Sequence, residues 1–224
     1  MRVVLPTSVL PTEQPSSTPA APAATRIQFK PGATQSITHG SLQPGQETVF
    51  VLEAQQGQMM MASLDSPNQD IGLSIAGKDG TVLLASSPVE TSFIGSLLSS
   101  QDYYFHLKGG ASGGSFTLSV IVAVPIRFAS GADKASFTGR TADGLAVTYS
   151  AYALQGQTMD VRLDVAGDSA ALTIWGLGSG EPYVRAQNGI RNYSLVLPAS
   201  QPYMIEVVPQ AGQVVDYTLT VQIR

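Results

Sequence analysis

Three aspartates in the first half of the chain are of the residue type that a calcium ion requires. Asp65, Asp70 and Asp79 fall within one short stretch, and hard cations prefer clustered carboxylate oxygens. Each also stands near turn-forming residues, and Asp79-Gly80 is a common hairpin signal. The pattern favours strand-end and turn positions over a calcium site, and we expect the protein to work without a metal.

Two histidines and two aromatic residues are the other candidates for chemistry. His39 and His106 could serve as a metal ligand or a general base, but each lies alone. His106 belongs to an alternating apolar run and should face solvent, as Glu206 does at the matching position of the second half. Trp175 and Tyr183 could form a platform for sugar stacking. Trp175 follows a residue expected in the core, so we expect no platform.

Other catalytic signatures are missing from the sequence. Without cysteine the chain has no disulfides, thiol catalysis or cysteine metal sites. It has no Gly-x-Ser-x-Gly nucleophile elbow, which requires a helix after the serine, because the match at residues 110–114 precedes a predicted strand; nor has it a phosphate-binding glycine loop before a helix. Its 16 acidic and 12 basic residues are scattered, which disfavours a nucleic-acid partner. No apolar run approaches the roughly 18 residues of a membrane span. We expect no enzyme activity and no cofactor.

The elements that would position these residues are encoded twice. The segment Ile27–Phe29 returns as Ile126–Phe128, a shift of 126 − 27 = 99 residues. Gln58 returns as Gln157 with the same shift, and its glycine neighbour returns with it. Further along the shift grows to 101, which two one-residue insertions in loops explain. The chain is therefore a duplicated unit of about a hundred residues.

Both copies have the pattern of strands. In the first copy, alternating or β-branched runs between turn signals predict eight strands, near residues 35–39, 47–54, 58–64, 71–76, 81–86, 92–98, 103–107 and 115–122. No window of 11 or more residues keeps a helical period. The predicted fold is all-β: two tandem jelly-roll-like antiparallel β-sandwiches, residues 26–124 and 125–224, after an extended segment, residues 1–25.

A short turn is predicted between the second and third strands of each copy. The glycines at 57 and 156 suit a hairpin turn because glycine readily adopts positive φ. Gln58 and Gln157 follow these glycines, and we expect each side chain to form a hydrogen bond across its turn. The strand after the turn alternates, so Met60 should face the core and Met59 and Met61 should face outward.

The motif order resembles the bacterial pre-peptidase C-terminal-like domains. Both copies carry Ile-x-Phe, Ala-x-x-Gly-Gln, Leu-Asp, Gln-x-Tyr and a closing Phe/Tyr-Thr-Leu-x-Val. The resemblance implies non-catalytic β-sandwich modules of secreted bacterial proteins, and some relatives bind collagen or polysaccharide. Some bind calcium through an acidic N-terminal linker, whereas Glu13 is the only acid of this segment. The second copy departs from the pattern at residues 177–180.

The N-terminal segment has the composition of a linker. Residues 1–25 are rich in Pro, Ser, Thr and Ala, so they bury too little apolar surface to fold alone. Pro6 and Pro11 interrupt its apolar stretch, so it is not a signal peptide. We expect an extracellular or cell-surface protein whose export signal is not present in this chain.

One surface patch is predicted as an interface. If the turn at Gly57 is a hairpin, outward Met59 and Met61 lie beside outward Val49 and Val51, where the second copy is polar. Exposed apolar clusters mark interfaces. The patch could be covered by loops of the first copy, by the second copy, or by the N-terminal segment added as a strand. The candidate residues of that segment are Val3, Val4, Leu5, Val9 and Leu10.

Three functional classes remain open. The favoured class is a non-catalytic structural or adhesive surface protein, which forms a homo-oligomer or filament or binds another surface protein. The second is a carbohydrate- or matrix-binding accessory module of a secreted hydrolase. The third is a hydrolase, in which loss of turnover on removal of Asp65 and Asp164 would reveal the catalytic acids.

Overall fold

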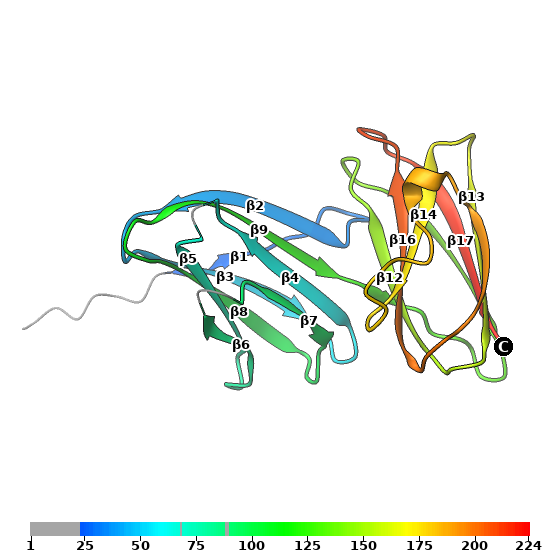
Figure 1. Ribbon diagram of the computed structural model, residues 1–224, viewed down its shortest axis with the longest axis horizontal. Helices are drawn as coiled ribbons and strands as arrows, with labels where there is room; N and C mark the ends of the chain where they lie inside the picture. The colour runs from blue at the N-terminus through cyan, green and yellow to red at the C-terminus, as the bar shows by residue number, and fades with distance from the viewer. Residues whose placement is uncertain (1–22, 68, 88–89) are drawn as a thin grey trace, which may run out of the picture.

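Alternating apolar side chains build two facing sheets in the first repeat. The computed structural model describes residues 23–67, 69–87 and 90–224. Sheet A has the order β1-β3-β8-β5-β6, and sheet B has the order β2-β9-β4-β7 (Figure 1). The strands are β1 Thr25–Arg26, β2 Gln35–Leu42, β3 Glu47–Ala54, β4 Met59–Asp65, β5 Ile71–Gly77, β6 Val82–Ser87, β7 Ser92–Ser96, β8 Gln101–Gly109 and β9 Gly114–Val122.

The second repeat is built in the same way. Sheet C has the order β10-β12-β16-β14, and sheet D has the order β11-β17-β13-β15. In place of a counterpart to β6, the chain has a bridge between Ile174 and Val184 and the short 3-10 helix Ala186–Asn188. The strands are β10 Val124–Pro125, β11 Lys134–Arg140, β12 Val147–Ala153, β13 Thr158–Val165, β14 Ala170–Gly176, β15 Asn192–Val196, β16 Gln201–Pro209 and β17 Asp216–Ile223.

Each repeat encloses its own apolar core. Met60 and its counterpart Met159 are fully buried, one in each core. The hydroxyl of Tyr103 donates to the carbonyl of Ser99, and that of Tyr203 donates to the carbonyl of its matching loop residue, both at 2.7 Å. These matched contacts explain the repeated tyrosine. The predicted fold class, two tandem antiparallel β-sandwiches, is confirmed.

The eight strands predicted for the first copy correspond to β2 through β9. The sequence pattern missed β1, a two-residue strand that pairs in parallel with β3. Its counterpart β10 pairs in parallel with β12, so the chain passes from one core to the other as a strand. Among the described residues, no helix has the length and apolar character needed to span a membrane.

The predicted hairpin between β3 and β4 is wrong. Within the described residues β3 pairs with β1 and β8, whereas β4 pairs with β7 and β9. The turn at Gly57 therefore carries the chain from sheet A to sheet B. The inner faces of β3 and β4 then pack against each other in the same core. The glycine does take a positive φ of 81°, as predicted. The glutamine prediction is confirmed: Gln58 Oε1 accepts from the Gln55 N–H at 2.7 Å, and Gln157 bonds the N–H of Leu154 identically.

Candidate functional site

An apolar cluster joins the two repeats. Met59 of β4 and Ala123 pack against Met204 of β16, and all three are buried. Met61, Trp175 and Leu177 are partly buried around them. Figure 1 shows the end of the first sandwich against the sheet that contains β12, β16 and β14. We call this contact the joint.

Polar contacts from one loop of the first repeat fix the joint at its edge. The Oγ1 of Thr34, which is 5% exposed, accepts a hydrogen bond from the Thr148 N–H at 2.9 Å. Thr148 of β12 is itself buried, so the bond satisfies a buried donor. Lys30 forms an ion pair with Asp143. Gly32 has a φ of +80°, and a Cβ atom there would lie 2.5 Å from the carbonyl oxygen of Arg140. The loop therefore fits closely against the second repeat.

The predicted interface patch divides into two places. Met59 and Met61 point away from the core, as predicted, and the second repeat covers Met59. Val49 and Val51 are buried on β3, which belongs to the opposite sheet. The four residues therefore do not form one surface, because β3 and β4 are not hairpin partners. The candidates Val3, Val4, Leu5, Val9 and Leu10 lie outside the described residues.

An apolar row continues from the joint across the outer face of sheet B. Met61 lies opposite Ile94 of β7 on one side and opposite Ile121 of β9 on the other. Ile37 of β2 lies diagonally beside Ile121, since its direct partner is Ser119. Ile94 is 43% exposed and Ile37 is 42% exposed. We call Ile94, Met61 and Ile121 the apolar row.

The matching face of the second repeat is polar. Ser194, Asp160 and Gln222 stand at the positions of Ile94, Met61 and Ile121. This face of sheet D contains a shallow hollow of about 390 Å³, which also borders Lys134, Arg162, Asn192 and Thr220. The duplication therefore conserved the cores but gave the two outer faces opposite character. Pairing each residue of one copy with its counterpart, Ile94 with Ser194 for example, would have revealed this difference from the sequence.

The three candidate calcium ligands have separate structural roles. Asp79 caps the β5–β6 turn by accepting from the Thr81 N–H at 2.9 Å, which lowers its pKa. Asp70 accepts from the Gly113 N–H at 3.0 Å and so holds a neighbouring loop. Asp65 ends β4. Within the described part of the chain, no three His, Cys, Asp or Glu residues are grouped to hold a metal ion.

Chelation should therefore leave stability unchanged. We expect EDTA to shift the melting temperature by less than about 2 °C, measured by calorimetry. A bound ion stabilises a fold by about 2.7 kcal/mol when it is present at a hundred times its dissociation constant. Its removal would therefore lower the melting temperature by more than about 2 °C. A larger decrease that calcium reverses would contradict the turn roles of Asp70 and Asp79.

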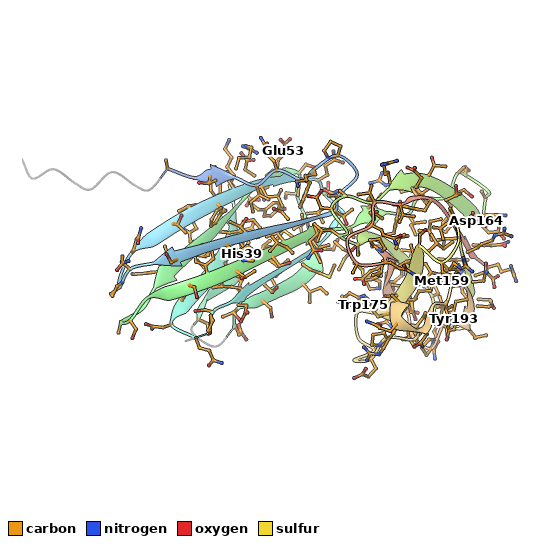
Figure 2. The ribbon with its side chains drawn as sticks, turned by 90° about the horizontal axis from the view of Figure 1, so that it is seen from above. His39, Glu53, Met159, Asp164, Trp175 and Tyr193 are labelled. Carbon is orange, nitrogen blue, oxygen red and sulfur yellow. The ribbon has the colours of Figure 1, made fainter. Side chains whose placement is uncertain are left out.

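The histidines and aromatic residues also have local partners. His106 lies on the outer face of sheet A and bonds Glu47 at 2.7 Å, and His39 bonds Thr117 at 3.0 Å. Trp175 packs into the joint, whereas Tyr183 packs against the core of the second repeat. In Figure 2 Trp175 lies on the side of the second repeat nearer the first. The two rings do not share a surface, so they form no sugar platform.

Glu206 of β16 makes the stability of the second repeat depend on pH. It lies opposite Thr148 on the sheet, and the Trp175 indole N–H donates to it at 3.5 Å. Burial raises its pKa above the ordinary value of 4.5. The folded protein therefore binds this proton more tightly than the unfolded chain does. The stability that the protonated Glu206 contributes is fully present below pH 4.5 and is lost as pH rises through the raised pKa. We expect Glu206→Gln to raise the melting temperature at pH 7.5 and to have no such effect at pH 4. Equal melting temperatures of wild type and variant at both pH values would contradict this assignment.

No family model matches the chain, and no curated protein matches it. Among solved structures, the chain is similar to PliG of Aeromonas hydrophila, a periplasmic lysozyme inhibitor of g-type lysozyme, with 29% identity and a TM-score of 0.40 over 46% of this chain and 96% of that one. The CUB1-EGF-CUB2 domain of human MASP-1/3 matches with 7% identity and a TM-score of 0.29 over 86% and 100%. The PBSX exported protein XepA matches with 13% identity and a TM-score of 0.31 over 88% and 89%. At TM-scores this low, these similarities assign neither a family nor a function.

Proposed function

We propose that this is a non-catalytic extracellular structural or adhesive protein, in which the joint holds two β-sandwich modules against each other. The joint carries the proposal, because the repeats differ from each other where they meet. Met59 stands where the second repeat has Thr158, and Met204 stands where the first repeat has Tyr104. A spacer or filament unit needs such a matched contact, whereas freely hinged binding modules do not. The resemblance to secreted pre-peptidase C-terminal-like modules supports the same proposal.

The finer part of the proposal is self-association through the N-terminal segment. This segment leads into β1, which lies at the edge of sheet A. It combines Pro-rich sequence with the apolar stretches Val3–Leu5 and Val9–Leu10. Flexible segments that become ordered on a partner can connect subunits head to tail. In this proposal the segment of one molecule binds a sandwich of the next.

Sedimentation velocity at several protein concentrations tests self-association. The full chain should form species larger than its 23.4 kDa monomer as concentration rises. The chain without residues 1–12 should stay monomeric, with an unchanged circular dichroism spectrum. A full chain that remains monomeric at its highest soluble concentration would overturn the proposal.

The polar hollow on sheet D favours a second candidate, a carbohydrate- or matrix-binding module. Amide, hydroxyl and charged side chains of Asn192, Ser194, Gln222 and Arg162 meet there, and such groups recognise sugar hydroxyls. Glycan-array binding by a monomeric chain, lost on Asn192→Ala with Gln222→Ala, would favour this function. The same array should carry collagen and a g-type lysozyme, the enzyme for which PliG is named, so that other partners are tested beside self-association.

A further inference from the structure

The outermost strand of sheet B has an open backbone edge. Within the described residues, β7 pairs with β4 alone. The Thr91 carbonyl accepts a hydrogen bond from the Leu64 N–H, and the Leu97 N–H donates to the Gln58 carbonyl. Successive residues of a strand direct their backbone groups to opposite sides, so the N–H and C=O of Ile94 point away from β4. The strand reads Ser-Phe-Ile-Gly-Ser, without the charge or proline that usually protects an edge. This edge can therefore accept another strand.

The apolar row ends at the same edge. A strand added beside β7 would place a side chain next to Ile94, which would lengthen the row formed with Met61 and Ile121. β15 of the second repeat is also an edge strand, but its row reads Ser194, Asp160 and Gln222. Only the first repeat thus combines an open edge with an apolar outer row, and that row is continuous with the joint.

We infer that the edge of β7 and the apolar row bind the N-terminal segment of a second copy of this chain as an added strand. The inference rests on the self-association proposed above and names its docking site. Val3 and Leu5 are two residues apart, so a strand places both of these apolar side chains on one face. Backbone hydrogen bonds supply the pairing, and the row selects apolar side chains.

The topology favours a second molecule over the segment's own. β6 contacts β7, so these two edges lie on one side of the sandwich. β1 lies at the other end of sheet A from β6. The residues before Thr25 would have to cross the full width of the sandwich to reach their own β7. Fully extended, the chain from Val3 to Thr25 spans roughly 70 Å, which is long enough to reach an adjacent molecule without crossing.

A synthetic peptide of residues 1–12 tests the site on the chain that lacks those residues. We expect saturable binding by calorimetry, with slower hydrogen exchange at the Ile94 amide. Ile94→Ser with Met61→Asp copies the second repeat onto the row and should weaken binding at least about tenfold. Val196→Ser on β15 is the matched control and should bind as the parent does, because exposed Val196 lies outside the row.

Each outcome decides between the site and the proposed function. Three results would overturn the docking site. The peptide fails to bind, it binds the double variant as tightly as the parent, or it slows hydrogen exchange only in strands other than β7. Exchange on the parent chain gives this answer even if the double variant misfolds. If the full chain self-associates through residues 1–12 but the peptide protects another surface, the proposed function stands and this site falls. If the full chain stays monomeric, both fall.

Discussion

Replacing Met204 by aspartate should release the two repeats from each other while each sandwich stays folded. Met204 is fully buried in the joint beside Met59 and Ala123. A buried carboxylate without a partner costs roughly 3–5 kcal/mol. Opening of the joint exposes the carboxylate to water and so avoids this cost. The residue lies on the outer face of β16, where its counterpart Tyr104 is only partly buried, so the fold of the second repeat does not depend on it.

Small-angle scattering and calorimetry measure this effect. The radius of gyration should increase, and one unfolding transition should separate into two. Met204→Leu is the control, since it conserves volume and should cost less than about 1.5 kcal/mol. A Met204→Asp chain with the scattering profile of the wild type would show that the cluster does not hold the repeats together.

Replacing Tyr149 by phenylalanine should destabilise the second repeat by about 1–3 kcal/mol, the cost of leaving a buried hydroxyl unpaired. The hydroxyls of Tyr149 and Tyr217 bond each other at 2.9 Å inside this core, and burial raises the pKa of both. The first repeat has Phe50 and Phe116 at these positions, packed edge to face at 6.3 Å. The double change Tyr149→Phe with Tyr217→Phe should therefore be nearly neutral.

Urea unfolding of the two single variants and the double variant measures the coupling as a double-mutant cycle. We expect a stabilising coupling of at least about 1 kcal/mol, because the double change removes both partners of one bond. Additive losses in the double variant would mean that each hydroxyl acts independently, which the mutual bond rules out.

Local patterns predicted the strands and the direction of most side chains. Alternation around Met60 correctly placed it in the core and Met59 and Met61 outside, because period two is a property of the strand alone. The Asp79-Gly80 signal correctly marked the turn between β5 and β6, where Gly80 has a φ of 87°. The duplication strengthened the predictions for the core strands and for the Gly57 turn, because the second copy repeats them at Met159 and Gly156.

Strand pairing and surface partners could not be predicted in the same way. A tight Gly turn fits a hairpin and a crossing between sheets equally well, so Val49 was wrongly placed beside Met59. The joint depends on Met59 against Met204 and on Thr34 against Thr148, pairs that are far apart in sequence and meet only through the packing of the two repeats.

Mixing two complementary variants tests the central claim, that the N-terminal segment of one molecule binds the apolar row of another. One chain carries Ile94→Ser with Met61→Asp and keeps its segment; the other lacks residues 1–12 and keeps the row. Each apolar side chain buried at the contact contributes about 1.5–3 kcal/mol, so the double variant, which lacks two of them, should not associate with itself. Sedimentation velocity should show monomers for each variant alone and a one-to-one complex for the mixture. A mixture that remains monomeric while the full chain assembles would contradict the claim.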